Sequence, residues 1–427
     1  MRRTVIGLST AVALALVAAA GPAVVAQDAE KPKVLVWTDA VRQPGFEAYR
    51  DSVADTVDVT VELVAQAEIL PKIQLANQAG SGHPDVVFAQ PNEIAIYQSP
   101  QVNYAMEWTP ELAGEGFLEG FGNANSWCVI DGKTWCVKND LAQTVLWYDA
   151  VTFEELGLTP PTTMDEFAAT ALTLKEAGYS SGAIGDQIFY AAYLWPSGCP
   201  VADVRSSTEL YINSQDPKCT RVAELVQPLV DAGALDRRSP FDAGFAAEIA
   251  GGKVAMTLGP SWYGDFVIRT PAPSWAHPAG RIAAAPMPKW EGDDVAYSGE
   301  WGGGIFVAFQ GSKYPQAAID TLKWMVSDPE HVKSGPTFPA YGPANEIWTA
   351  RVADDDYYVG DVGDAMTVQS QLIRPNVGPV RYPLDAEIGA TLSTMIRNGE
   401  PIQAAIDALA QQSANLAQTV GYSVVSQ

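Results

Sequence analysis

The sequence of 427 residues contains few histidines, few cysteines and few basic residues. Its three histidines are His83, His277 and His331, and the spacing of its four cysteines matches no zinc-binding pattern. We find no serine-hydrolase elbow, no zinc-binding helix motif and no phosphate-binding loop. Three scattered histidines also leave little material for general acid–base catalysis. The sequence therefore predicts no metal site and no other cofactor, and it argues against an enzyme.

Positive charge is scarce, with 26 Lys and Arg against 50 Asp and Glu, so the formal net charge is −24. Nucleic-acid binding needs a basic surface that neutralises phosphates, so we do not expect a nucleic-acid partner. The same sign of charge argues against attachment to an anionic membrane surface. Because the acidic residues are spread along the chain, we interpret them as a solvated surface that keeps the protein soluble.

A long apolar run occurs only at the N-terminus, and no later stretch could cross a bilayer. Arg2 and Arg3 precede an uncharged apolar stretch at 5–20, which a proline and a group of small residues follow. This order predicts a signal peptide of residues 1–26 that is cleaved before Gln27. A twin-arginine signal and a retained helix are the alternatives. No cysteine lies at the cut, so no lipid anchor is evident, and we expect a monomer in the periplasm or outside the cell.

The cysteines suit an oxidising compartment, where an even number allows two disulfides. They are Cys128, Cys136, Cys199 and Cys219. The first two bracket Asp131-Gly132, which is a hairpin turn signal. A three-residue loop would place these two cysteines opposite each other, whereas a strict two-residue loop would offset them by one position. We predict a disulfide across this hairpin and leave the register of the hairpin open. Elimination then pairs the other two cysteines.

The first part of the chain alternates between predicted strands and a helix. A short apolar run at 34–37 reads as a buried strand, and alternation at 57–64 predicts a second strand. Residues 68–79 carry apolar side chains on one helical face and end at a glycine pair. A further buried strand follows at 85–89. Strand, helix and strand in this order predict a parallel α/β sheet.

The rest of the chain keeps this mixed character and contains no internal repeat. Residues 163–166 form a capping box, which predicts that a helix begins there. A helix near 222–229 should be kinked or bounded by Pro228. We predict a strand at 305–309 and a helix that follows a proline and covers 318–326. The end of the chain reads as all-helical over 385–397 and 401–420.

Six groups of segments, in this order, resemble the extracellular solute-binding proteins of ABC sugar importers, the maltose-binding-protein-like family. The segments are VLVW at 34–37, GHPDVVF at 82–88, DGKTW at 131–135 with the strand at 143–148, LGLTPPTTMDEF at 156–167, GGKVAM at 251–256 with GPSW at 259–262, and APMP at 285–288 with GGG at 302–304 and KWM at 323–325. The resemblance covers nearly the whole chain after the signal peptide.

This resemblance implies an α/β, two-lobed periplasmic-binding-protein fold with the ligand in a cleft between discontinuous lobes. The N-terminal lobe would comprise 32–139 and 302–344, and the C-terminal lobe 140–301 and 345–427. The chain would cross between the lobes at hinges that let the clamp close. The implied partners are a carbohydrate ligand and the permease subunits of an ABC transporter.

Candidate binding residues follow predicted strands, because open α/β sheets bind ligands at the carboxyl ends of their strands. Trp37, Thr38 and Asp39 end the first strand, and Gln90 and Asn92 follow the third. A carboxylate, amides and a hydroxyl at these points could bond the hydroxyl groups of a sugar. The alternative role for Asp39 is to cap the following helix.

Aromatic side chains could stack on the C–H faces of a sugar, although most aromatic residues in any protein belong to its core. Trp195 follows an aromatic stretch and is one candidate. Trp301 lies at the second predicted crossing with Gly302 and Gly303, where glycines let the backbone approach a ligand and let a hinge bend. Tyr341 lies at the third crossing.

The resemblance assigns roles at further positions. Trp262, with Tyr263 beside it, matches a stacking aromatic of the family. Asp140 matches an acidic sugar-binding position at the first crossing, and stabilisation of the hinge is its alternative role. Asn92 also matches an acidic position, so an amide here changes the pattern of hydroxyl contacts. Arg381 precedes a helix that contacts sugar in some relatives.

Two other functions stay open at this point. A secreted glycosidase would use a pair of carboxylates about 5–10 Å apart, and the sequence cannot place such a pair. The same fold could instead bind a polyamine, another cation or a metal complex, as the many acidic residues allow.

Overall fold

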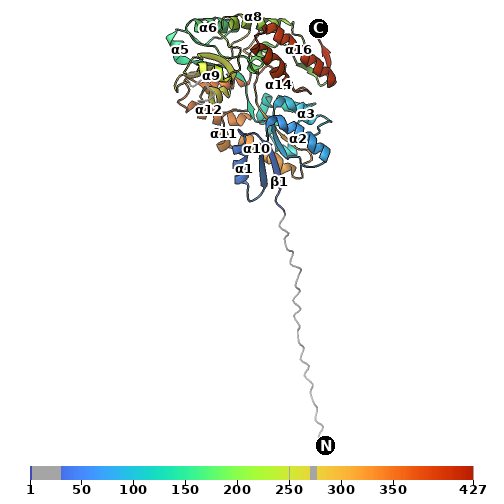
Figure 1. Ribbon diagram of the computed structural model, residues 1–427. Helices are drawn as coiled ribbons and strands as arrows, with labels where there is room; N and C mark the ends of the chain where they lie inside the picture. The colour runs from blue at the N-terminus through green and yellow to red at the C-terminus, as the bar shows by residue number, and fades with distance from the viewer. Residues whose placement is uncertain (2–29, 250, 270–276, 427) are drawn as a thin grey trace. The chain divides into compact units, whose positions relative to one another are not determined.

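The computed structural model describes residues 1, 30–249, 251–269 and 277–426. It contains a five-stranded sheet, to which β1 belongs (Figure 1). Its strand order is β2-β1-β3-β13-β6. The strands are β1 Lys33–Thr38, β2 Asp58–Leu63, β3 Val86–Ala89, β6 Val137–Lys138 and β13 Ile305–Ala308. The predicted signal peptide lies outside the described residues apart from Met1, so it stays a prediction.

The parallel sheet predicted from the sequence is confirmed for its first three strands, because β1 pairs in parallel with both β2 and β3. All four residues of β3 are buried, as expected for a strand covered on both faces. β13 comes from much later in the chain and pairs antiparallel with β3 and with β6. The sheet is therefore built from two distant parts of the sequence.

Three helices pack on this sheet, and Figure 1 shows them around β1: α1 Gln43–Ser52, α2 Gln66–Ala79 and α10 Pro315–Ser327. Ile69, Ile73 and Ala76 form the buried face of α2. This helix ends at Gly80, whose φ of 68° is a left-handed conformation that favours glycine. In the core, Phe46 packs edge-on against Phe306 of β13 with ring centroids 5.5 Å apart.

A second, antiparallel sheet has the order β11-β8-β12, and its strands are β8 Thr144–Asp149, β11 Met256–Pro260 and β12 Ile282–Ala285. Nearby helices are α5 Ala150–Glu155, α6 Met164–Glu176, α8 Pro217–Asp231, α12 Asn345–Ala353, α13 Val362–Ser370 and α16 Ile402–Thr419. The capping box predicted for α6 is confirmed: Thr163 Oγ1 accepts from the amide of Glu166, and Glu166 Oε2 accepts from the amide of Thr163.

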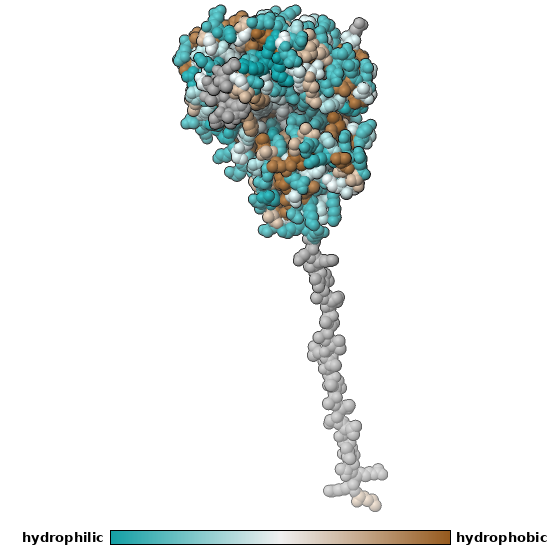
Figure 2. Space-filling view, viewed as in Figure 1, coloured by the Kyte–Doolittle hydropathy of each residue, from teal (hydrophilic) through white to brown (hydrophobic). Residues whose placement is uncertain are grey.

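Shorter elements connect these parts. The helical segments are η1 Pro91–Glu93, α3 Ile94–Gln98, α4 Pro110–Ala113, η2 Leu118–Cys128, η3 Tyr190–Leu194, α7 Trp195–Ser197, α9 Ala243–Ile249, η4 Gly264–Ile268, α11 Pro329–Ser334, η5 Gly342–Ala344, α14 Leu384–Glu387, η6 Ile388–Ser393 and α15 Thr394–Arg397. Within the described ranges, no helix is long and apolar enough to cross a membrane. Figure 2 shows hydrophilic residues over much of the visible face, with apolar residues scattered among them.

Two local predictions hold only in part. Pro228 does not bound α8, which continues to Asp231 because Val222, Val226 and Leu229 bury its apolar face and outweigh one lost backbone hydrogen bond, and the alternative of a kink at Pro228 stays a prediction. The helices predicted at 385–397 and 401–420 are present, but the end of the chain is not all-helical, because β15 Ser423–Val425 follows α16. This strand is too short to give a periodic signal. It pairs in parallel with β10 Glu209–Tyr211, which also pairs with β9 Asp203–Ser206.

Three chain segments run side by side between the two sheets. The amide of Asn139 donates to the carbonyl of Gly304 at 2.8 Å, and the amide of Trp301 donates to that of Ala142 at 3.2 Å. β7 Asp140–Leu141 also pairs antiparallel with β14 Phe338–Pro339. These segments coincide with the crossings expected from the resemblance, whereas the exact lobe boundaries stay a prediction.

The predicted disulfides Cys128–Cys136 and Cys199–Cys219 are both present, with Cα atoms 5.0 Å and 4.5 Å apart. The hairpin of β4 Val129–Ile130 and β5 Lys133–Thr134 has a two-residue loop, because Ile130 pairs with Lys133. Its register places Cys128 opposite Trp135, whose amide donates to the Cys128 carbonyl. The cysteines are thus offset by one position, and both lie just beyond the paired strands, where the backbone can bring them together.

Replacing either cysteine pair by serine is expected to lower the free energy of unfolding by about 2–3 kcal/mol. The disulfides close loops with sequence separations of 8 and 20 residues, and without them the unfolded chain regains conformational freedom. Denaturant unfolding of the two double variants would measure the effect. Dithiothreitol should destabilise the wild type by the sum of both effects; unchanged stability of either double variant would contradict the prediction.

Candidate functional site

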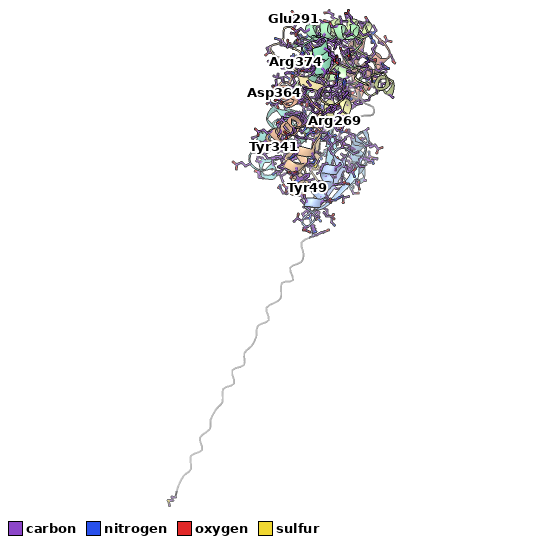
Figure 3. All side chains as sticks on the ribbon, turned by 90° about the vertical axis from the view of Figure 1, so that its left-hand side faces the viewer. Tyr49, Arg269, Glu291, Tyr341, Asp364 and Arg374 are labelled. Carbon is purple, nitrogen blue, oxygen red and sulfur yellow. A yellow bond between two sulfur atoms is a disulfide. The ribbon has the colours of Figure 1, made fainter. Side chains whose placement is uncertain are left out.

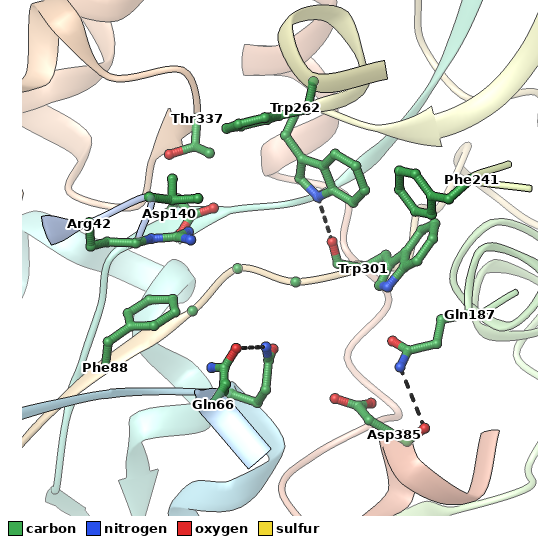
Figure 4. Close-up of a pocket in the computed structure, with 16 residues that line it drawn as sticks. Arg42, Gln66, Phe88, Asp140, Gln187, Phe241, Trp262, Trp301, Thr337 and Asp385 are labelled. Carbon is green, nitrogen blue, oxygen red and sulfur yellow. Dashed lines mark hydrogen bonds and ion pairs between the residues drawn. The ribbon is translucent and has the colours of Figure 1, made fainter. Parts of the chain in front are cut away.

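A cavity of about 490 Å³ lies where the crossing segments meet the ends of the two sheets (Figure 4). Its volume falls within the range of small-molecule sites, which is about 300–1,000 Å³. Side chains reach it from the loop after β1, from α2, from the loop before α9 and from α14. The backbone of Gly302–Gly304 also lines it. A molecule in this cavity would touch segments that are far apart in the sequence.

One wall of the cavity is aromatic. Trp262 lies just after β11, and its Nε1 donates to the carbonyl of Trp301 at 2.7 Å, which fixes the indole ring (Figure 4). The Phe241 ring is nearly parallel to Trp262, with centroids 6.3 Å apart and an angle of 10°. Trp301 stands edge-on to Trp262 at 5.3 Å. Phe266 extends this wall. Flat, fixed rings of this kind offer faces on which a flat apolar surface can stack.

An ion-pair group forms part of the opposite side. Arg42 contacts Asp39 at 3.1 Å and Asp140 at 3.3 Å, and its guanidinium lies 4.2 Å from the centroid of the Phe88 ring. Asp140 also accepts a hydrogen bond from Asn139 Nδ2 at 2.6 Å. Figure 4 shows Arg42 and Asp140 together across from Trp301. Since Arg42 is held by two carboxylates and one ring, its charge is already compensated within the protein.

Amide groups supply further hydrogen-bonding capacity. Gln90, directly after β3, donates from Nε2 to Gln66 Oε1 at 2.9 Å, which orients both side chains at the cavity. Gln187 donates to the main-chain oxygen of Asp385 at 3.5 Å. These groups leave donors and acceptors for a ligand with hydroxyl groups.

Two carboxyl groups near the cavity have raised pKa values. Burial is the main cause that raises the pKa of Glu93 to about 7, and the negative charge of Asp385 adds to the shift. Burial also raises the pKa of Asp385, which lines the cavity, to about 6. The charged form of each group is therefore disfavoured in the folded protein without a ligand.

Stability should consequently fall as pH rises from 5 to 8. The pKa of Glu93 is raised from 4.5 to about 7, so its contribution is fully present below pH 4.5 and is lost as pH rises through 7. For Glu93 the loss is about 3 kcal/mol. Glu93→Gln should flatten the pH dependence of unfolding between pH 5 and 8, whereas the exposed Glu115→Gln should not. An equal pH dependence in wild type and Glu93→Gln would contradict this assignment.

The structure places several of the predicted binding residues in the cavity wall. They are Gln90, Asp140, Trp262, Trp301, Gly302 and Gly303. Both glycines have positive φ, 99° and 74°. A Cβ on Gly303 would also lie 3.0 Å from Glu300 Oε1, so a side chain there would be strained and crowded.

The other predicted residues at the ends of β1 and β3 do not line the cavity. Asp39 forms an ion pair with Arg42, which lines the cavity. Its Oδ1 accepts from the amides of Val41 and Arg42, so Asp39 closes a turn and does not cap α1. Trp37 is largely buried and donates to a carboxylate of β2. Thr38 and Asn92 are buried.

The remaining predicted residues pack against other parts of the protein. They are Trp195, Tyr263, Tyr341 and Arg381. Trp195 stacks on Trp127 at 5.5 Å and donates to the carbonyl of Arg374, and Tyr263 packs edge-on against Trp262 at 5.0 Å. Tyr341, labelled in Figure 3, stacks on a phenylalanine ring at 5.1 Å. Arg381 lies 4.2 Å from the centroid of the Tyr422 ring.

Sequence reasoning missed several residues that line the cavity: Arg42, Gln66, Phe88, Gln187, Phe241 and Asp385. Arg42 could have been found, because it follows Asp39 in the loop after the first strand. The 40 % exposure of Phe241 is unusual for its type but is invisible in the sequence. The others sit on elements whose approach to the cavity depends on the tertiary fold.

Several solved structures with a similar fold are sugar-binding proteins. The galacto-N-biose/lacto-N-biose I-binding protein of an ABC transporter from Bifidobacterium longum is 17% identical, with a TM-score of 0.75, and the match covers 93% of this chain and 100% of that one. The binding protein from B. animalis subsp. lactis, solved with β-1,6-galactobiose, is 18% identical, with a TM-score of 0.71 and coverage of 93% and 100%. The sugar-binding protein MalE from Xanthomonas citri is 15% identical, with a TM-score of 0.71 and coverage of 91% and 98%.

These matches define the class of the fold, which is that of the two-lobed binding proteins of ABC transporters. Residues 47–353 match the family model of the bacterial extracellular solute-binding proteins, and the chain belongs to this family. No curated protein sequence gives a significant match. The family resemblance and the fold class predicted from the sequence are confirmed.

Proposed function

We propose that this protein is the solute-binding component of an ABC importer and that it captures a mono- or oligosaccharide in the cavity described above. The observation that carries the proposal is the pairing of an aromatic wall with a polar wall across one cavity. Sugars have just these two properties, because C–H patches cover their ring faces and hydroxyl groups surround their edges. The fold and the sugar ligands of similar proteins support this assignment.

Several modest contacts are enough for useful affinity. Each stacked ring contributes about 0.5–1.5 kcal/mol beyond its burial, by analogy with aromatic pairs. Each hydroxyl hydrogen bond contributes about 1 kcal/mol, and more where the partner is a carboxylate. A few of each reach about −8 kcal/mol, which corresponds to micromolar affinity.

The proposed mechanism is closure of two lobes, 32–139 with 302–344 and 140–301 with 345–427. The hydrogen-bonded crossing segments with Gly302 and Gly303 would act as the hinge. Arg42 and Gln90 would bind the sugar from one lobe, and Trp262 from the other. A ligand that contacts both sides stabilises the closed form, because it binds that form better than the open one. The closed protein, in the periplasm or outside the cell, would then deliver the sugar to the membrane permease.

Calorimetry and melting curves with a panel of neutral and amino-bearing mono- and oligosaccharides test the proposal, together with solution scattering. We expect micromolar or tighter binding of at least one sugar and a smaller radius of gyration with it. The same incubations, analysed for products, test the absence of catalysis. No heat and no compaction with any saccharide would overturn the proposed function, and steady turnover would favour a carbohydrate-active enzyme.

A further inference from the structure

The charges around the cavity are unbalanced. Arg42 is the cation that lines the cavity in the described part of the chain, and Asp39 and Asp140 already hold it. Lys138, the next cation along the crossing, contacts Glu300 at 2.5 Å. Asp385 and Glu93 have no ion-pair partner among the described residues. Two carboxyl groups thus lack a compensating cation, and Asp385 is the one that lines the cavity.

Asp385 is placed to contact a ligand. It lies in the first turn of α14, and Figure 4 shows its carboxyl group turned toward the cavity while its main-chain oxygen accepts from Gln187. Within the described ranges, no hydrogen bond to this carboxyl group is present. Tyr190 is 5% exposed, and burial together with the charge of Asp385 raises the pKa of its hydroxyl group. This hydroxyl lacks a hydrogen-bond partner in the same ranges. The carboxyl group of Asp385 and the hydroxyl group of Tyr190 are therefore both without a hydrogen-bond partner in the described ranges.

A charge on Asp385 disfavours a second negative charge on Glu93. The negative charge of Asp385 is one of the causes that raise the pKa of Glu93. A neutral hydroxyl can donate a hydrogen bond to one carboxylate, but it does not remove the repulsion between two. A positive group near both would do so, and each bond it donates to a carboxylate would be charge-assisted.

The aromatic wall favours the same kind of ligand. The faces of Trp262, Trp301 and Phe241 carry negative electrostatic potential, which attracts a cation or polarised C–H groups next to one. The formal net charge of −24 also attracts cations from a distance. The potential at the ring faces and the net charge of the protein therefore both favour a cationic ligand.

We propose that the preferred ligand is a sugar that carries a protonated amine, with the ammonium group beside Asp385 and Glu93 and the sugar ring against Trp262. This inference rests on the proposed function and narrows its substrate class. Asp385 is the specificity-determining residue, and Glu93 increases the preference for positive charge.

Calorimetry at pH 7 with matched sugars tests the inference. The probes are glucosamine, galactosamine and chitobiose, each compared with its N-acetylated form and with the corresponding neutral sugar, which is glucose, galactose or cellobiose. Acetylation removes the charge and keeps the nitrogen, and the neutral sugar replaces it by a hydroxyl. We expect at least one amine to bind about tenfold or more tightly than both of its partners, as one charge-assisted bond predicts.

Variants separate the local effect from net charge. Asp385→Asn should abolish the preference for the amine, and Glu93→Gln should reduce it. Asp165→Asn is the matched control, because it removes one exposed carboxylate from the first turn of another helix, α6. Melting curves of all variants check that they fold.

The outcomes are distinct. Equal or weaker binding of every amine compared with its acetylated or neutral partner would overturn the inference and leave the proposed function standing. An amine preference that survives in a folded Asp385→Asn would overturn the role of Asp385. Failure of every saccharide in the wider panel to bind would overturn the proposed function itself.

Discussion

Replacing Lys138 by alanine is expected to lower the free energy of unfolding by about 3–5 kcal/mol. Lys138 Nζ contacts both carboxylate oxygens of Glu300, at 2.7 and 2.5 Å, and the side chains are 2% and 4% exposed. Without the lysine, the Glu300 carboxylate would remain buried, and among the described residues only the amide of Ala142 would donate to it, at 3.3 Å. An uncompensated buried charge is the reason for the large effect. Because the pair joins two crossing segments, the loss should also loosen the proposed hinge.

Denaturant unfolding measures this effect. The matched control is Lys133→Ala, whose pair with Glu107 is 2.6 Å long but has side chains 53% and 35% exposed. Its loss should change stability by less than about 1 kcal/mol. The double variant Lys138→Met/Glu300→Leu should recover most of the stability, since no charge is then left unpaired. A loss in Lys138→Ala no larger than in Lys133→Ala would disprove the structural role of the buried pair.

Trp262→Ala is expected to weaken sugar binding about 10- to 100-fold, the second large effect. Its ring combines a broad apolar face with an orientation fixed by the hydrogen bond to Trp301. Removing it takes away the central stacking surface and leaves Phe241 without its parallel neighbour. Truncation of a central aromatic anchor typically has an effect of this size. Calorimetry with the best sugar from the panel measures it.

Two further variants interpret the result. Trp262→Phe keeps a ring face but loses the indole donor, so we expect an intermediate affinity. Trp324→Ala is the matched control, because Trp324 belongs to α10 and packs on Tyr49 at 5.6 Å, away from the cavity. It should change stability and leave affinity unchanged. Wild-type affinity in Trp262→Ala would exclude this residue as the stacking platform.

Local patterns predicted much of the fold. Alternation and apolar runs identified β1, β2 and β3, and the capping box located the start of α6. The Asp131-Gly132 turn signal predicted the Cys128–Cys136 bridge but left its register open. These successes share one cause, which is that the interactions involved span few residues. β15 and the continuation of α8 were missed because distant packing decides them.

The sequence by itself determined the family, the alternation of strands and helices, the disulfides and a set of candidate residues at strand ends and crossings. Only the tertiary structure decided which of them meet. Arg42 reaches Asp140 across 98 positions of sequence, and Lys138 reaches Glu300 across 162. Phe241 and Asp385 join the same cavity from a loop and a short helix that carry no periodic signal. Contacts of this kind depend on how the crossing segments pack, and no local spacing encodes that packing.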